Sequence, residues 1–293
     1  MIHYLVYDIG GTSVKLSIMD EHSNVIERAS FSTPAVRNGS IFQLLIETAK
    51  SYQEKYTLSG LALSVPAAVD EKSGYVHYAG QITDFTGKNI KNELADLGIP
   101  IELENDANCA ALAEKWKGNA QDCSSFVCLT IGTGIGGGIY LNGDLYRGKK
   151  GMAGEVGRMY MNASQPIEKN ILSRLGSTWN LLHRVFLKTG ERMTGEELFK
   201  RYYLNDHRIS EIVDTFFDML AVGSANLIHT LAPEKILFGG GISEQPNFAD
   251  HIRERLHLIC PDLLSITEIE VCKFGNAAGQ VGALYHFLRM RDK

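Results

Sequence analysis

The sequence lacks the features that mark several large classes of protein. Its five cysteines are scattered and odd in number, and none has C-x-x-C spacing, so neither a disulfide framework nor a zinc knuckle is indicated. No apolar run reaches the roughly 18 residues that a membrane span requires, and the first residues show no signal-peptide pattern. The formal net charge of -5 offers no basic surface for nucleic acid. We therefore expect a cytoplasmic protein that binds neither nucleic acid nor a membrane.

What is present is the composition of a soluble globular protein with a sizeable core. Hydrophobic residues make up 44% and charged residues 22% of the 293 residues. This length is enough for about two domains. Glycine is the one unusual count, because the chain has 29 glycines, about 10% against an average near 7%. The excess glycines are clustered, and the clusters follow predicted strands.

Three glycine clusters come directly after apolar runs that are typical of buried strands. The stretch "LVYDIGGTSVKLSIMD" at 5–20 predicts a strand, a glycine turn and a second strand, and the stretch at 126–146 repeats this plan. The third cluster, at 235–244, is a buried strand that enters three glycines, with helical patterns on both sides of it. Strands that alternate with helices indicate an α/β protein, and the repeated hairpin indicates two related lobes.

Two nucleotide-binding patterns match the second cluster by chance. Gly132–Gly137 satisfies G-x-G-x-x-G, but a strand and an Asn142-Gly143 turn follow, where the dinucleotide motif needs a helix. Gly143–Lys149 resembles a P-loop, but Lys150 stands where Ser or Thr must bind magnesium. We therefore assign neither motif.

The glycine hairpins are nevertheless candidates for phosphate binding. Successive backbone N–H groups that glycine exposes form a concavity for anions. A tight strand turn explains each hairpin equally well when it is taken alone. Asp8 ends a buried strand before the first turn, and Thr12 and Thr133 place hydroxyls beside the two turns. The combination favours a triphosphate between the hairpins, with adenosine against the third glycine cluster.

Asn105 and Asp106 lie where a short extended run meets an alanine-rich helical pattern, in "ENDANCA". Asn and Asp are preferred N-cap residues because their side-chain oxygens accept hydrogen bonds from free backbone N–H groups of the first turn. A carboxylate at this position is also well placed to accept a proton from a bound alcohol. Both interpretations stay open on these residues alone.

Five segments together resemble the ROK family of sugar kinases, which belongs to the actin, Hsp70 and hexokinase superfamily. They are "DIGGTSVKL", "ENDANCAALAE", "IGTGIGGGI", "GMAGEVGR" and "ILFGGGIS". Their order and approximate spacing match the family, and the resemblance covers essentially the full chain. It implies a two-lobed actin-like ATPase fold, of the ribonuclease H-like type, with nucleotide and sugar in the cleft between the lobes.

The resemblance also implies a division of the chain. We expect an N-terminal lobe at 1–118 with the first phosphate loop, and a C-terminal lobe at 119–275 with the second phosphate loop and the adenosine site. We expect the helical segment at 276–293 to pack back on the N-terminal lobe. The boundary falls where "KGNAQD" at 117–122 interrupts a helical pattern.

By resemblance, the enzyme uses ATP and magnesium. Asp8 would hold magnesium, through water. The residues that match the family's nucleotide-binding positions are Asp8, Gly10, Gly11, Thr12, Lys15, Thr133, Gly134, Gly240 and Gly241.

The sugar side follows the family in three residues and departs from it in one. Asp106 matches the family's catalytic base, and Asn105 and Glu155 match its sugar-binding residues. Arg158 replaces the family's histidine. It either binds a sugar oxygen or pairs with Glu155.

A second departure concerns the family's zinc segment. Ser164, Pro166 and Ile171 stand at its cysteine positions and Ser173 at its glutamate position. No zinc is expected, because neither thiolates nor an imidazole remain to bind it. Replacing the glutamate by Ser173 removes charge and volume near C1 and C2 of the sugar.

The favoured substrate is therefore a β-glucoside such as cellobiose, phosphorylated on a 6-hydroxyl. N-acetylmannosamine is the second candidate, followed by glucose and fructose. Some family members are sugar-sensing repressors, but "DIGGT" begins at residue 8 and leaves no room for a helix-turn-helix module before it. A catalytically silent sugar-binding protein is disfavoured because Asp106 and both phosphate loops are present. The resemblance implies a homodimer.

Overall fold

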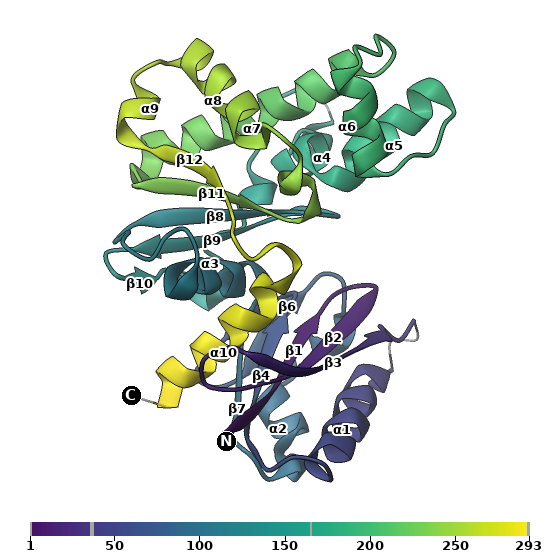
Figure 1. Ribbon diagram of the computed structural model, residues 1–293, viewed down its shortest axis with the longest axis vertical. Helices are drawn as coiled ribbons and strands as arrows, with labels where there is room; N and C mark the ends of the chain where they lie inside the picture. The colour runs from purple at the N-terminus through teal and green to yellow at the C-terminus, as the bar shows by residue number, and fades with distance from the viewer. Residues whose placement is uncertain (1, 36–37, 165, 292–293) are drawn as a thin grey trace. The chain divides into compact units, whose positions relative to one another are not determined.

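The computed structural model describes residues 2–35, 38–164 and 166–291, which form two compact units (Figure 1). Unit 1 comprises Met1–Trp116, Arg147–Ala153 and Ala277–Lys293, and unit 2 comprises Lys117–Tyr146 and Gly154–Asn276. Each unit has a five-stranded sheet. None of the helices within the described ranges combines the length and the apolar character that crossing a membrane requires.

Unit 1 is built on a mixed sheet with the strand order β3-β2-β1-β4-β7. Strands β1 to β3 are antiparallel neighbours, whereas β1, β4 and β7 run parallel. The strands are β1 (His3–Ile9), β2 (Ser13–Met19), β3 (Val25–Ser32), β4 (Leu58–Val65) and β7 (Ile101–Asn105), and a separate hairpin is formed by β5 (Ala67–Asp70) and β6 (Tyr75–Ala79). The carboxyl ends of the three parallel strands lie at one edge of this sheet, where ligands bind in open α/β sheets.

Helices cover both faces of this sheet, which explains why the middle of β1, residues 4–7, has no polar side chain in alternate positions. Leu5, Tyr7 and Ile9 join a core cluster with side chains of α1, while Tyr4 and Val6 join a second cluster with side chains of α3 and α10. A strand that is buried on both faces has no polar alternation. The helices are α1 (Ser40–Gln53), α2 (Ile90–Glu93), α3 (Asp106–Lys117) and α10 (Ala278–Arg291), with 3₁₀ turns η1 (Thr83–Phe85), η2 (Ala95–Leu97) and η3 (Lys149–Gly151).

Unit 2 repeats the strand plan of unit 1. Its sheet has the order β10-β9-β8-β11-β12, with an antiparallel β8–β9 hairpin and parallel β8, β11 and β12. The strands are β8 (Phe126–Ile131), β9 (Ile135–Leu141), β10 (Asp144–Leu145), β11 (Lys235–Gly239) and β12 (Glu268–Val271). The structure therefore contains the two related lobes that the repeated glycine hairpins predict. At the turn before β10, Asn142 and Gly143 both have positive φ, as this dipeptide allows in a tight hairpin.

The helices of unit 2 pack around α7, which carries eleven buried residues along its 22-residue length. Phe216 and Phe217 on α7 contact Phe248 on α8, and Phe238 on β11 contacts the same ring. The helices are α4 (Leu172–Gly176), α5 (Thr178–Thr189), α6 (Gly195–Tyr203), α7 (Ser210–Leu231), α8 (Phe248–Ile259) and α9 (Leu263–Ile266). The 3₁₀ turns are η4 (Val156–Arg158), η5 (Ile167–Lys169), η6 (Gly241–Glu244) and η7 (Gly275–Ala277).

One segment of the chain does not follow the division into two contiguous lobes that the sequence suggests. Residues 147–153, which such a division places in the C-terminal lobe, group with unit 1. The reason is a close backbone approach, because Gly151 lies against the backbone of Val69 in β5, at a distance that leaves no space for a Cβ atom. Helix α10 also belongs to unit 1, and residues 292 and 293 of the expected C-terminal segment lie outside the described residues.

Candidate active site

The first glycine turn joins β1 to β2 and is held closed by backbone hydrogen bonds. The Gly10 N–H donates to the Ser13 carbonyl at 2.9 Å. Thr33, just beyond β3, ties the turn down from the side, because its N–H donates to the Thr12 carbonyl at 3.0 Å and its hydroxyl to the Gly10 carbonyl at 2.7 Å. The Thr12 side chain remains exposed. The turn is therefore fixed in shape, with its outer residues available to a ligand.

Asp8 lies on β1 just before this turn, and its carboxylate is held from two sides. The Ser64 hydroxyl on β4 donates to Oδ1 at 2.8 Å, and Lys15 Nζ on β2 lies 3.4 Å from Oδ2. Gly279 on α10 packs against the same carboxylate, where a Cβ atom would clash with Oδ1. Asp8 and Lys15, both predicted at the nucleotide site, therefore form one cluster.

Asn105 and Asp106 mark the junction of β7 and α3, and Asn105 provides the helix cap. Its Oδ1 accepts from the N–H groups of Ala107 at 3.0 Å and Asn108 at 3.1 Å, and its Nδ2 donates to the Ala67 carbonyl at 3.1 Å. Asp106 is the first residue of α3, and its Oδ1 accepts from the Ala107 N–H at 2.9 Å. The capping interpretation of this dipeptide is thus correct for Asn105, and it leaves the Asp106 carboxylate at a helix N-terminus, where negative charge is favoured.

Asp8 and Asp106 converge on the same edge of the unit 1 sheet. The register pairs Asp8 with Ser64 and Ser64 with Glu104, so that these residues form one row across β1, β4 and β7. The buried Cys109 on α3 lies close enough to all three carboxylates of this edge to feel their charge. Burial, and then the carboxylates of Glu104, Asp8 and Asp106, raise the pKa of its thiol well above the usual value. Cys109 therefore stays protonated and unreactive.

The second glycine turn joins β8 to β9 in unit 2. The Gly132 N–H donates to the Gly134 carbonyl at 2.9 Å, and the exposed Thr133 lies between them. The Ser173 hydroxyl braces the turn from α4, because it accepts from the Ile135 N–H at 2.9 Å. The strand β9 follows this turn, where the dinucleotide-binding motif needs a helix, so the structure agrees with our decision not to assign that motif.

The third glycine cluster lies beside the second. Gly240 has a φ of 93° and its backbone packs on the Ile131 carbonyl at the end of β8, so that a side chain at this position would be both strained and blocked. Gly241 begins η6, and the Ser243 N–H donates to the Gly240 carbonyl at 3.0 Å. The second and third glycine clusters are thereby brought to one edge of the unit 2 sheet.

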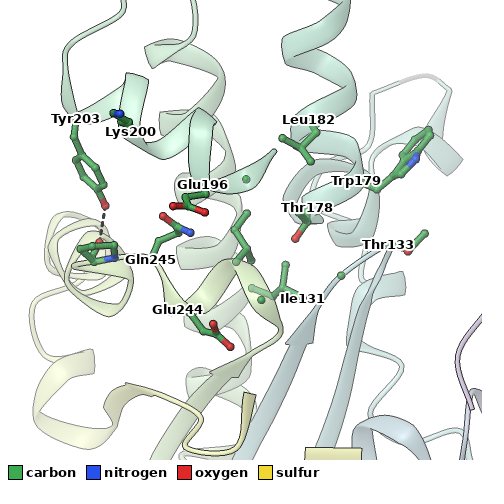
Figure 2. A pocket seen from close by; sticks show the side chains of 15 residues that line it. Ile131, Thr133, Thr178, Trp179, Leu182, Glu196, Lys200, Tyr203, Glu244 and Gln245 are labelled. Atoms are coloured by element: carbon green, nitrogen blue, oxygen red, sulfur yellow. Dashed lines mark hydrogen bonds between the residues drawn. The ribbon is translucent and has the colours of Figure 1, made fainter. Parts of the chain in front are cut away.

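A cavity of about 920 Å³ opens at this edge, within unit 2. Figure 2 shows the side chains of α5 on one side of it and those of α6 and of the segment after η6 on the other. Of the predicted nucleotide-binding residues, Thr133 and Gly241 line the cavity. The other residues that line it are Ile131, Gly132, Thr178, Trp179, Leu182, Gly195, Glu196, Lys200, Tyr203, Ile242, Glu244, Gln245 and Pro246.

The lining residues from α5 and α6 were not predicted, because they belong to no motif for ligand binding. One local signal does mark the start of α6. Thr194 and Glu197 form a capping box, in which the Thr194 hydroxyl accepts from the Glu197 N–H and the Glu197 carboxylate accepts from the Thr194 N–H. The spacing T-x-x-E is readable in the sequence. It locates the helix without indicating that the helix faces a cavity.

The predicted sugar-binding residues Glu155 and Arg158 lie just before η4 and at its end, and they pair with each other, with Arg158 Nε 3.2 Å from Glu155 Oε2. The turn packs closely on β9, because Gly154, with a φ of 86°, lies directly against the Gly137 carbonyl. Ser173 lies where a Cβ atom on Gly157 would point. Ser173 thus touches both the η4 turn and, through Ile135, the second glycine turn.

The donor set of the first glycine turn suits magnesium that arrives with a nucleotide. Across the described ranges, no three His, Cys, Asp or Glu side chains gather in a group that could hold a metal ion by themselves. Magnesium is commonly bound by one or two carboxylates together with substrate phosphates and water. Asp8 supplies one such carboxylate beside the turn.

Comparisons with known proteins agree with these features. The family model described as the ROK family matches residues 4–290. A β-glucoside kinase of Listeria monocytogenes is 37% identical over 294 residues, which covers 98% of this chain and 98% of that protein. A solved L. monocytogenes structure, provisionally described as an N-acetylmannosamine kinase, is 35% identical, covers 99% of this chain and 100% of its own, and superposes with a TM-score of 0.91.

A third relative was solved with a disaccharide. It is a ROK family protein of Streptococcus pneumoniae in complex with sucrose, 28% identical, with a TM-score of 0.88 and coverage of 99% of each chain. These matches span the full chain, and the solved relatives share the fold of both units. The chain belongs to the ROK family of sugar kinases, with the actin-like ATPase fold.

Proposed function

We propose that the protein transfers the γ-phosphate of ATP to the 6-hydroxyl of a β-glucoside such as cellobiose. The observation that carries the kinase chemistry is the convergence of Asp8, the first glycine turn and Asp106 on one edge of the unit 1 sheet. Phosphoryl transfer through a loose transition state requires mainly positioning and charge neutralisation. Asp106, at a helix N-terminus, would meet the positioning requirement, and the backbone N–H groups of the first glycine turn, Lys15 and the magnesium that Asp8 would hold would meet the second.

In this proposal Asp106 orients the sugar hydroxyl and accepts its proton. Asn105 uses both lone pairs of its Oδ1 and one Nδ2 hydrogen in contacts with described residues, so it contributes its second Nδ2 hydrogen to the sugar. Glu155, held by Arg158, binds further sugar hydroxyls. Magnesium, held by Asp8 through water, would neutralise phosphate charge.

The nucleotide is proposed to bind through the three glycine clusters. Backbone N–H groups of Gly10, Gly11 and Thr12, with Lys15, would contact one part of the triphosphate, and Thr133 and Gly134 another. The adenosine would occupy the cavity that Gly241 lines, next to Gly240. Polar side chains on the cavity wall, among them Glu196, Lys200 and Gln245, offer partners for the base and ribose.

Two observations support a β-glucoside as the acceptor. The similarity to a β-glucoside kinase extends over 98% of the chain at 37% identity, and another relative accommodates the disaccharide sucrose. At the position of the family's glutamate, this chain has Ser173, whose hydroxyl binds the Ile135 backbone. Arg158, at the position of the family's histidine, pairs with Glu155. N-acetylmannosamine is the second candidate, because the relative with a TM-score of 0.91 is provisionally described as its kinase.

The test is ATP consumption with magnesium against cellobiose, gentiobiose, N-acetylmannosamine, glucose and fructose. We expect kcat/KM for a β-glucoside to exceed that for glucose by about 10-fold or more, the discrimination that one or two pocket contacts provide. The phosphorylated position is then read from the ³¹P coupling to the C6 protons of the product. A higher kcat/KM for N-acetylmannosamine or a free hexose would reject the β-glucoside. A homodimer and a cytoplasmic location remain predictions.

A further inference from the structure

The residue that precedes Asn105 carries a buried carboxylate which the proposed mechanism does not use. Glu104 is the second-last residue of β7, and its side chain is only 1% exposed. Three donors surround it: the Asn105 N–H at 2.8 Å and Asn108 Nδ2 at 3.0 Å reach Oε1, and Arg147 Nε reaches Oε2 at 2.7 Å. Burial of an ionised carboxylate is expensive, and it is tolerated where such donors satisfy it.

Arg147 supplies the positive charge, and it comes from a distant part of the sequence. It lies two residues after the end of unit 2's strand β10, at the start of the 147–153 segment of unit 1. Its side chain is 19% exposed, and its Nε is also 3.7 Å from Glu71 Oε2. The Arg147 carbonyl accepts from the Ala153 N–H at 2.9 Å, which closes the segment that continues into the Glu155 turn.

His286 on α10 completes the surroundings without adding charge. Its Nδ1 lies 4.0 Å from Glu104 Oε2, and its buried Nε2 has no hydrogen-bond partner among the described residues. Burial, and then Arg147, lower the pKa of His286 to about 3. The ring is therefore neutral near pH 7, and Arg147 is the cation that balances Glu104.

The contacts of Glu104 reach Asn105 directly and Asn108 in the first turn of α3, the turn that Asp106 begins. Its Oε1 holds the Asn105 N–H and the Asn108 amide, while Asn105 Oδ1 in turn accepts from the Asn108 N–H. These bonds fix the peptide between β7 and α3, and so fix the direction in which the Asp106 side chain leaves the helix. A misplacement of about 1 Å at a reacting group can reduce the rate by about 100-fold.

We propose that the buried Glu104–Arg147 pair is a positioning device that orients Asn105 and Asp106 for proton transfer from the acceptor hydroxyl. The inference rests on the proposed kinase function and extends it to two residues that do not touch the substrate. The competing explanation is an ion pair that stabilises unit 1 and leaves the geometry of Asp106 unaffected. The two explanations differ in what removal of both charges does.

The test compares Glu104→Gln, Arg147→Met and the double variant. Glu104→Gln keeps the volume and an acceptor oxygen, and Arg147→Met keeps most of the length without the charge. Arg147→Met leaves the buried Glu104 charge without its partner, and Glu104→Gln leaves Arg147 with the more distant Glu71 alone, so either single change can impair folding. The double variant leaves neither charge and therefore provides the folded protein for the kinetic comparison.

A matched control pair lies on the same strand. Glu102, two residues before Glu104 on β7, pairs with Lys91 at 2.7 Å, with side chains 19% and 21% exposed. The control is the double variant Lys91→Met with Glu102→Gln. The stoichiometry of nucleotide binding counts folded sites in every preparation, so that kcat is expressed per folded site.

We expect the Glu104→Gln/Arg147→Met protein to bind nucleotide with normal stoichiometry and with KM for ATP within about twofold, while kcat falls about 10- to 100-fold. The control pair should leave kcat within about threefold of wild type. A double variant with wild-type kcat, or an equal loss in the control, overturns the positioning role. The assay uses whichever sugar the wild type phosphorylates fastest. If the wild type phosphorylates none of the five sugars, the proposed function itself fails, which is a distinct result.

Discussion

At the scale of single residues, the β7–α3 junction assigns different tasks to two adjacent polar side chains. Asn105 satisfies the free N–H groups of Ala107 and Asn108 with one oxygen, as a helix cap does. Asp106 begins the helix, and its Oδ1 accepts from the Ala107 N–H. The cap thus stabilises the backbone, and the second residue presents a carboxylate at the positive end of the helix dipole.

The proposed role of Asp106 predicts a specific kinetic result. Asp106→Asn retains a side-chain oxygen for the Ala107 N–H, so the start of α3 should be preserved. It removes the proton acceptor, so kcat should fall at least about 100-fold, the usual scale for a general base, while sugar affinity stays nearly unchanged. Steady-state kinetics and calorimetric titration of the sugar measure the two quantities.

Asp96→Asn, at an exposed carboxylate in η2 of the same unit, serves as the control and should leave kcat unchanged. Near-normal turnover by the Asp106→Asn protein would remove Asp106 from the mechanism. A loss of sugar binding together with activity would instead assign it to substrate binding.

At the scale of elements, the glycine turns were predictable and the walls of the cavity were not. A turn such as Gly10-Gly11 is determined locally, because apolar strands on both sides and glycine between them allow few other conformations. The wall residues Trp179 and Lys200 lie on helices with no motif, and their position depends on how α5 and α6 pack in unit 2. That packing is set by contacts between segments far apart in the sequence, which local pattern does not encode.

The cavity wall predicts a spectroscopic signal for nucleotide binding. The chain has two tryptophans. Trp179 lines the cavity, is 49% exposed and stacks on His183, whereas Trp116 stacks on Tyr285 in unit 1. We expect magnesium-ATP to change the emission of Trp179, because a bound base changes its contact with water.

Two variants that each keep one tryptophan show which residue gives the change in emission. The Trp116→Phe protein should keep the emission change on titration with magnesium-ATP, and the Trp179→Phe protein should lose most of it. If the change follows Trp116 instead, the nucleotide does not occupy the cavity beside α5.

At the scale of the whole molecule, the repeated strand plan could be predicted from the sequence. That residues 147–153 belong to unit 1 could not. Two glycine hairpins with similar surroundings predict two related sheets, and β3-β2-β1-β4-β7 corresponds to β10-β9-β8-β11-β12. Gly151 gives no local sign that it will approach Val69. The Arg147 side chain likewise meets Glu104 across 43 residues of sequence. Such pairings appear only when the chain is folded.

Burial of His286 makes the free energy of unfolding depend on pH, and substitution of this one residue tests that dependence. His286 is 2% exposed, and burial, aided by Arg147, Lys91 and Arg289 and opposed by Glu71, lowers its pKa from 6.5 to about 3. In the unfolded chain the same group takes up a proton near pH 6.5. Between these values the unfolded state binds more protons, so the free energy of unfolding must fall as the pH falls, by up to about 1.4 kcal/mol per pH unit.

Denaturant unfolding between pH 7 and about pH 4.5 measures this contribution. His286→Gln removes the titrating ring, so its free energy of unfolding should decline less steeply with acid than that of the wild type, and the two curves should converge as the pH falls. His257→Gln, at an exposed position on α8, controls for the loss of a histidine elsewhere and should run parallel to the wild type. Parallel curves for wild type and His286→Gln would mean that His286 takes up its proton without unfolding, and that α10 opens locally to let the proton in.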